Sequence, residues 1–137
     1  MRNQNYPERA RVFAPPALTT LIRVSKAPLG PEDEKIITLA RSTRARVAAA
    51  EGAAVRDETG RTYAAAAVAL PSLHLSALRL AVAMAVSSGA SALEAAALVS
   101  DAEQPDPGDL AAVRDIGPGA TVFHAAPDGT LRATLRP

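Results

Sequence analysis

Cysteine is absent from this chain of 137 residues. Its absence excludes disulfides, thiolate metal ligands and a cysteine nucleophile, and it gives no reason to expect an oxidising compartment. Long uninterrupted apolar runs are also missing, including at the N-terminus, where a signal peptide or a membrane anchor would require one. We therefore expect a soluble cytoplasmic protein without a membrane partner.

Aromatic side chains make up only 3% of the chain, although 48% of its residues are hydrophobic. Much of the hydrophobic share is alanine, so we expect a core of small and branched aliphatic side chains that brings its elements close together. The length suits one domain, which buries roughly two-thirds of the surface of its unfolded chain.

Acidic residues are scarce at the N-terminus. Residues 1–30 carry five basic residues against one acidic residue, whereas residues 31–137 carry ten basic and thirteen acidic residues. The basic stretch also holds four prolines, which favours a poorly ordered N-terminal extension over 1–30 and a single domain over 31–137. A basic arm can neutralise phosphate, but only two aromatic residues accompany these charges, too few to stack bases. Nucleic acid is therefore unexpected as a partner, apart from this tail.

The longest segment with clear ends lies between Pro71 and Gly89. Pro71 ends the preceding run, Ser72 is placed to cap a first turn, and Gly89 stops a helix of about four turns. Apolar residues occupy nearly every side of this helix, which predicts burial in the core or in a subunit interface. The exceptions are His74, Ser76 and Arg79.

Two strands joined by a tight turn are predicted over residues 51–57 and 62–70. Gly60 supplies the positive φ that such a hairpin requires. The run Ala64–Ala67 favours a helix by propensity alone, but the proline that follows argues against one long helix. Asp57 is expected to be solvated at the turn, together with the acidic residue beside it.

The remaining pattern completes a layered α/β domain. A proline and three acidic residues open a helix from residue 31 to about residue 46, because they suit the positive end of the helix dipole. Asp109 is placed to cap a short helix that ends at Ile116. The order α-β-β-α-β-α-β-β predicts a mixed five-stranded sheet with helices on both faces. The other strands are predicted over 95–100, 120–125 and 130–135, with the last at the edge of the sheet.

Four segments in this order, at residues 51–55, 57–63, 75–82 and 99–101, resemble segments of the small homotetrameric zinc-dependent cytidine deaminases. Residues 51–55 and 57–63 look like that family's Val-Gly-Ala-Ala strand and its acidic-Gly turn. Residues 75–82 are similar to its Cys-Ala-Glu-Arg-x-Ala-Ile helix, and residues 99–101 resemble the segment before its Pro-Cys-x-x-Cys loop. The resemblance covers residues 31–137 and implies a three-layer cytidine deaminase-like fold in a homo-oligomer, either a dimer or a tetramer.

The same resemblance implies a degenerate site. In the family three cysteines hold zinc, and a glutamate moves the proton while zinc-bound hydroxide attacks the pyrimidine ring. The ligand positions correspond here to Ser76, Asp106 and Asp109, and the glutamate corresponds to Leu78. A hydroxyl and two carboxylates lack the soft donors of zinc sites, and leucine cannot move a proton. We therefore expect no catalytic residue and no bound metal.

The positions that contact substrate in the family are also changed. The ribose-binding Asn and Glu correspond to Ala67 and Ala69, and the aromatic residue that stacks on the base corresponds to Ala49. Metal ligands, proton carrier and substrate contacts are lost together, which suggests a domain that has kept the fold without its chemistry.

Arg79 matches the arginine of the family's helix motif. A charged side chain in a buried helix must be paired or solvated, so we expect it to pair with Asp106 or Asp109, or to contact another subunit. A harder metal shared by these carboxylates with His74 and His124 is chemically conceivable, but their separation in sequence disfavours it. His74 is expected instead at a helix start, and His124 in a strand near a turn.

Together these features predict a catalytically inactive cytidine deaminase homologue that acts as an oligomeric binding or scaffold protein. Two alternatives stay open. One is a nucleoside deaminase that converts cytidine to uridine at an altered zinc site. The other is a sensor that binds a nucleoside or nucleotide at the remnant substrate pocket.

Overall fold

The computed structural model describes residues 21–22 and 29–137. Most of the predicted extension 1–30 therefore lies outside the described residues, and its character stays a prediction. Within it, β1 (Leu21–Ile22) pairs with the C-terminal strand β8 (Leu131–Leu135) in antiparallel fashion. This short part of the extension belongs to the sheet of the domain.

The main sheet has six strands in the order β1-β8-β7-β6-β2-β3. In this sheet β6 and β7 run parallel and the other neighbours run antiparallel, so the sheet is mixed as predicted. Five of its strands are those that the sequence predicts. The sixth, β1, lies outside β8, so the prediction that the last strand forms the edge is wrong. The remaining strands are β2 (Gly52–Asp57), β3 (Thr62–Ala66), β6 (Leu93–Val99) and β7 (Thr121–Ala125).

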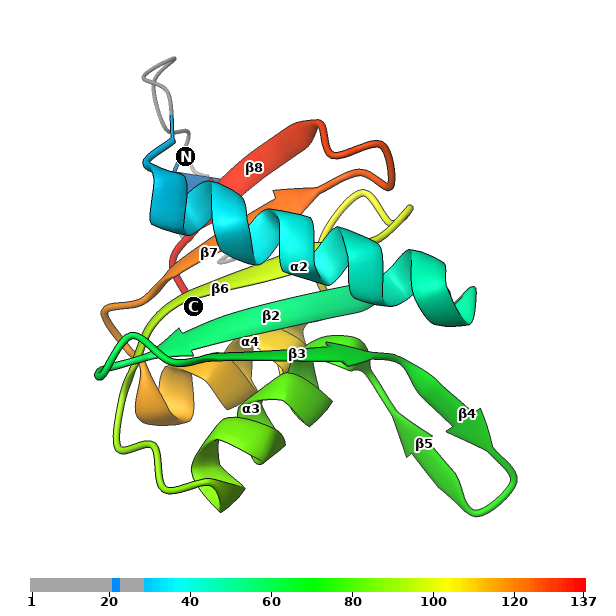
Figure 1. The fold of residues 1–137 in the computed structure, drawn as a ribbon, viewed down its shortest axis with the longest axis horizontal. Coiled ribbons are helices and arrows are strands. Elements are labelled where there is room, and N and C mark those ends of the chain that lie inside the picture. Colours follow the sequence, from blue (N-terminus) through cyan, green and yellow to red (C-terminus); the bar gives the residue numbers. More distant parts are fainter. Residues whose placement is uncertain (1–20, 23–28) are drawn as a thin grey trace, which may run out of the picture.

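Helices cover both faces of this sheet and give the predicted three-layer α/β fold (Figure 1). α2 (Pro31–Val47) lies on one face, and α3 (Ala77–Ser87) and α4 (Pro107–Ile116) lie on the other. Successive residues of β2 show the division, because Ala53 belongs to the core beneath α3 and α4 whereas Ala54 belongs to the core beneath α2. Among the described residues, no helix is long and apolar enough to span a bilayer.

Small residues let the layers approach closely, as the composition predicts. A Cβ atom on Gly52 would collide with the backbone oxygen of Ala40 in α2. Only glycine fits where the helix crosses the start of β2.

A separate two-stranded sheet interrupts the expected order. The strand predicted over 62–70 breaks after Ala66, and its last part, β4 (Val68–Leu70), pairs with β5 (Leu73–Leu75). The hairpin projects from the domain (Figure 1). Pro71 starts the turn between the two strands, because its fixed φ suits a tight turn.

The helix predicted between Pro71 and Gly89 therefore starts four residues too early, with Ser72 in place of Ser76 as its cap. The N-cap of α3 is Ser76, whose hydroxyl oxygen accepts a hydrogen bond from the N–H of Arg79 at 3.2 Å. The prediction of Ser72 as the cap is wrong, because the residues after it pair as β5. The end of the helix agrees with the prediction, since Gly89 adopts a φ of 101° just beyond it.

The start of α4 differs from the prediction in a similar way. Its N-cap is Asp106, whose carboxylate accepts a hydrogen bond from the N–H of Gly108 at 2.9 Å. Pro107 then takes the first helical position, which its fixed φ favours. The predicted cap, Asp109, lies inside the first turn instead, where its side chain is buried.

Candidate functional site

The two helices on one face of the sheet begin close to each other. α3 follows the β4–β5 hairpin, and α4 follows the loop that leaves β6. Contacts join the N-terminal residues of the two helices into one group of polar side chains, which we call the junction cluster. It consists of Ser76, Arg79, Asp106 and Asp109, four of the five predicted remnant-site positions.

Ser76 links the two helices of the junction cluster. Its hydroxyl donates a hydrogen bond to Oδ1 of Asp109 at 2.7 Å, while its oxygen caps α3 by accepting from the N–H of Arg79. The serine thus uses its hydroxyl both as a donor and as an acceptor. It fixes the start of α3 against the first turn of α4.

Asp109 is the buried carboxylate of the junction cluster, with 2% of its side chain exposed. Nε of Arg79 lies 3.3 Å from its Oδ1. Burial raises the pKa of Asp109, because the charged form loses its hydration. The hydrogen bond from Ser76 and the charge of Arg79 oppose this rise, whereas the charge of Asp106 adds to it. The arginine therefore helps to keep a buried carboxylate charged.

Arg79 contacts both acidic residues of the junction cluster. Besides its contact with Asp109, one of its terminal nitrogens lies 3.6 Å from Oδ2 of Asp106. The predicted pairing is confirmed. The side chain is 51% exposed, so Arg79 lies on the open side of α3 and not inside a buried helix as expected. Its pair with Asp106 is also exposed and contributes little by itself, because water screens it.

Leu78 lies in the hydrophobic core and not in the junction cluster. Its side chain is 0% exposed and packs among the aliphatic residues of the core beneath α3 and α4. The position that corresponds to the proton-carrying glutamate of the resemblance is therefore occupied by a packing residue.

The three alanines at predicted substrate-pocket positions lie in different elements. Ala49 is half-buried between α2 and β2, and Ala67 is half-buried between β3 and β4. Ala69 is exposed on the projecting hairpin, opposite His74. None of the three offers a polar side chain, so hydrogen bonds to a ligand at these positions fall to the backbone.

Glu51 is a polar residue near the junction cluster that the sequence patterns do not single out. Its Oε1 accepts a hydrogen bond from the N–H of Ala77, the first residue of α3, at 3.3 Å. A carboxylate suits this place because a helix N-terminus carries partial positive charge. The only signal in the sequence is a single charged residue directly before a buried strand. Its role becomes clear from the structure, where α3 begins beside it.

The two histidines are not members of the junction cluster. His74 is exposed on β5, so its expected place at a helix start is wrong. His124 is fully buried in β7, near the turn as predicted. Its Nε2 lies 3.0 Å from the hydroxyl of Ser100, and its Nδ1 has no hydrogen-bond partner among the described residues. Burial lowers the pKa of His124, and the charge of Arg132 lowers it further. In the part of the chain that the structure describes, no three acidic or imidazole side chains form a group suited to a metal ion.

Comparison with known proteins agrees with the arrangement of the fold. A family model described as cytidine deaminase-like matches residues 29–129. The chain belongs to the cytidine deaminase-like family. No curated protein sequence matches it.

Two solved structures share the cytidine deaminase-like fold. A cytidine deaminase from Burkholderia pseudomallei is 22% identical, with a TM-score of 0.65 over 74% of this chain and 90% of that chain. A cytidine deaminase from Mycobacterium leprae is 18% identical, with a TM-score of 0.57 over 73% of this chain and 91% of that chain. At these identities the likeness concerns the fold, and the site must be argued from the residues of this chain.

The residues of this cytidine deaminase-like chain do not fit the zinc ion that the resemblance implies. The junction cluster offers oxygen atoms only, whereas zinc sites use sulfur or imidazole donors. One oxygen of each carboxylate is also engaged, since Oδ2 of Asp106 caps α4 and Oδ1 of Asp109 is shared by Ser76 and Arg79. A guanidinium beside both carboxylates also repels a divalent cation.

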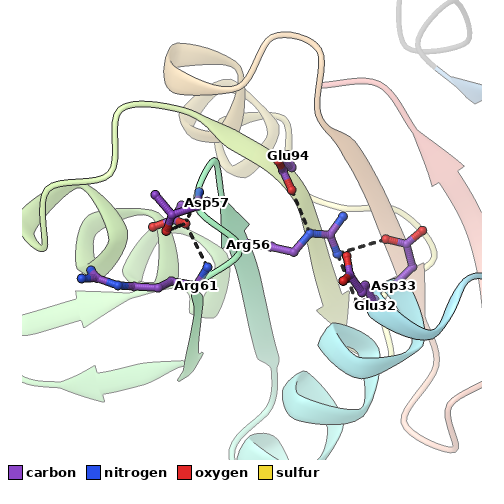
Figure 2. A network of polar contacts seen from close by, with 7 residues as sticks. Glu32, Asp33, Arg56, Asp57, Arg61 and Glu94 are labelled. Atoms are coloured by element: carbon purple, nitrogen blue, oxygen red, sulfur yellow. Dashed lines mark hydrogen bonds and ion pairs between the residues drawn. The ribbon is translucent and has the colours of Figure 1, made fainter.

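A second group of polar side chains lies at the other end of β2 and connects structural elements. Figure 2 shows Arg56 between Glu94 of β6 and Asp33 of α2, at N–O distances of 3.1 and 3.2 Å. The same guanidinium donates to the backbone oxygen of Glu32 at 3.2 Å. Arg56 therefore ties the first turn of α2 to two neighbouring strands.

Asp57, next to Arg56, is buried at the β2–β3 turn, against the prediction of a solvated residue. Its Oδ1 accepts hydrogen bonds from the N–H and hydroxyl of Thr59 and from the N–H of Arg61, at 2.7 to 3.0 Å. Its Oδ2 accepts from the hydroxyl of Tyr63 at 2.8 Å. Burial alone would raise the pKa of Asp57, but these hydrogen bonds outweigh it and lower the pKa to about 2. Gly60 holds the turn at a φ of 89°, as predicted.

Proposed function

We propose that this protein is a catalytically inactive cytidine deaminase homologue, cytoplasmic and oligomeric, that works as a binding or scaffold protein. The observation that supports the proposal best is the closed set of contacts in the junction cluster. Ser76 and Asp109 satisfy each other, Arg79 neutralises the carboxylates, and Leu78 is part of the core. The positions that correspond to the family's metal ligands and proton carrier therefore hold one mutually bonded set of hydroxyl, guanidinium and carboxylate groups and one packing leucine.

Hydrolytic deamination of a pyrimidine ring needs two things at the reacting carbon. One is a water molecule activated by a metal ion, and the other is a group that moves its proton. Glu51 is the remaining carboxylate near the start of α3, and its Oε1 is bonded to the helix N-terminus. We therefore include the absence of a zinc cofactor and of deaminase activity in the proposal.

Apolar side chains on the surface support the oligomeric part of the proposal. Leu70 and Leu73 are exposed at the end of the projecting hairpin, and Met84 and Val86 are exposed on α3. Large exposed apolar groups that are close together mark interaction surfaces. A second copy of the chain that covers them would make the dimer or tetramer that the sequence predicts.

An activity assay tests the absence of chemistry. The full chain, prepared with zinc in the growth medium, is incubated with cytidine and deoxycytidine, and the products are separated by chromatography. A cytidine deaminase such as that of Burkholderia pseudomallei serves as the positive control. We expect no uridine, and we expect elemental analysis to find far fewer zinc ions than protein chains. Turnover that EDTA abolishes would establish the enzyme alternative with its altered zinc site.

Light scattering after size exclusion tests the oligomer. We expect a mass of two or four chains for the wild type, and a smaller mass for the double variant Leu73→Ser and Met84→Ser. Val47→Ser is the matched control, because Val47 is as exposed as Leu70 but lies at the end of α2 on the other face of the sheet. A wild type that runs as a monomer at all concentrations would remove the oligomeric scaffold from the proposal.

A second candidate function, a nucleoside or nucleotide sensor, is favoured by Glu51. Its carboxylate has a second oxygen available to hydrogen-bond donors of a ligand near Ala67. A ligand at about one hundred times its Kd stabilises a protein by roughly 2.7 kcal/mol, which is several degrees in Tm. A rise in Tm with cytidine or uridine that Glu51→Gln abolishes, and that Glu103→Gln in the exposed loop leaves intact, would establish the sensor.

A further inference from the structure

Arg79 occupies a place that is unfavourable for a cation without help from neighbours. It lies in the first turn of α3, where the free N–H groups already carry partial positive charge. Its guanidinium extends to the first turn of α4, which is a second positive helix end. Asp106 and Asp109 both belong to that N-terminus and compensate the charge from 3.6 and 3.3 Å.

Gly108 makes room for this guanidinium. A Cβ atom at position 108 would collide with a terminal nitrogen of Arg79 and would lie 3.0 Å from its Cζ. Glycine is a poor helix former compared with alanine, yet it stands here inside the first turn of α4. The helix thus carries an unfavourable residue at the one point where the arginine from α3 packs on its backbone.

We infer that Arg79 is a built-in cation that joins α3 to α4, at the place where the family resemblance implies a zinc ion. Like a metal ion, it holds two carboxylates of α4 around one positive charge, which here is supplied by α3. Unlike a metal ion, it belongs to the chain, so a chelator cannot remove it. The inference concerns the stability of the helix junction, and it does not depend on the proposed function.

A double-mutant cycle in the full chain tests the inference. The variants are Arg79→Met, Gly108→Ala and the two together, and Tm is measured with and without EDTA. Arg79→Met is expected to lower Tm by a few degrees, because it leaves the buried carboxylate of Asp109 without its cation. Gly108→Ala is expected to lower Tm in the wild type, where it displaces the guanidinium. The same change is expected to lower Tm less in the Arg79→Met background, where the guanidinium is gone and only Oδ2 of Asp106, 2.9 Å from the added Cβ, must shift.

A smaller effect of Gly108→Ala in the Arg79→Met background is the signature of the contact. Arg114→Met is the matched control, because this exposed arginine lies in the last turn of the same helix, and its Tm is expected to equal that of the wild type. A Gly108→Ala change that shifts Tm equally in both backgrounds would overturn the inference, as would an Arg79→Met protein with an unchanged Tm.

The test also works if Arg79→Met does not fold. The cycle is then run with Arg79→Lys, which keeps the charge but lacks the terminal nitrogen that the added Cβ would meet, and an equal effect of Gly108→Ala in both backgrounds contradicts the contact. A wild type that EDTA destabilises and zinc restores would show that a metal ion holds the junction, and the inference would fall. Failure of the proposed function is seen separately, as uridine production in the activity assay.

Discussion

Asp57 and Asp109 are buried to the same degree, yet their environments shift their pKa values in opposite directions. Asp57 accepts four hydrogen bonds at the β2–β3 turn, and its pKa falls to about 2. Asp109 accepts one hydrogen bond from Ser76 and meets one arginine, and burial raises its pKa. The hydrogen-bond donors around a buried carboxylate, and not burial by itself, therefore set the direction of its pKa shift.

The charges of Asp57 and Asp109 are therefore stabilised in different ways. At the turn, backbone and hydroxyl donors are fixed by a hairpin of a few residues, so the charge of Asp57 is supported locally. At the helix junction, the charge of Asp109 depends on Arg79, a long and half-exposed side chain from another helix. A negative charge is therefore stabilised less at the helix junction than at the β2–β3 turn.

The largest effect is expected from a buried carboxylate that has no hydrogen-bond donors around it. Leu78→Glu restores the residue type of the family's proton carrier inside the core beneath α3 and α4. We expect a loss of at least ~3 kcal/mol in the free energy of unfolding, because an unpaired charge is buried there. Chemical denaturation measures the loss. Leu78→Met, which nearly conserves volume, is the control and should cost less than about 1.5 kcal/mol. A Leu78→Glu protein as stable as the control would show that the position is hydrated.

The direct test of the comparison is to neutralise each aspartate in turn. Asp57→Asn should lower Tm at pH 7 by several degrees, because the folded state prefers the charged form. Asp109→Asn should lower Tm by less, because burial opposes the charged form of Asp109 and the amide oxygen still accepts from Ser76, although Arg79 loses one counter-charge. The pH dependence follows with opposite signs. The contribution of Asp57 is complete above its ordinary pKa of 3.8 and is lost as the pH falls towards about 2. Thermal unfolding between pH 2 and pH 7 checks both variants, and equal losses at pH 7 would refute the distinction.

His124 is a third buried titratable group, and its protonation affects stability in a different pH range from that of the two aspartates. Its folded-state pKa is lower than its ordinary value of 6.5, so the unfolded chain takes up a proton first. Its neutral form therefore stabilises the fold fully above pH 6.5, and this stability is lost as the pH falls below that value. We expect Tm to decrease between pH 6.5 and pH 5 in the wild type and to stay level in His124→Leu. An identical decrease in both proteins would assign the effect to other groups.

The smallest expected effect concerns Glu51, the carboxylate at the start of α3. Glu51→Gln keeps an acceptor for the N–H of Ala77 but removes the charge from the helix N-terminus. We expect a loss of about 0.5 kcal/mol at low ionic strength and less at high salt, because exposed helix-dipole interactions are screened. Denaturation in low and high salt measures it. A loss that does not change with salt would point to packing and not to charge.

Local sequence signals predicted some of these features well. Proline and three acidic residues mark the start of α2, and Gly60 marks the β2–β3 turn, because each residue acts within its own turn. The start of α3 was missed for a physical reason. Residues 73–75 are apolar enough for a helix, and only their pairing with residues 68–70 makes them a strand. The prediction of a solvated Asp57 is wrong because the neighbouring sequence does not reveal that the donors of its own turn fold onto the carboxylate.

The layered α/β order, the family resemblance and the absence of cysteine ligands could all be predicted from the sequence. Each of them depends only on residue identity and local periodicity. It also predicted that Arg79 would need a carboxylate, because a cation in an apolar helix must be compensated. Only the tertiary structure decided that Ser76 bonds to Asp109, thirty-three residues away. It also decided that Leu78 belongs to the core and that two buried aspartates carry opposite pKa shifts. The reason is that burial and donor count depend on which distant residues the fold brings together.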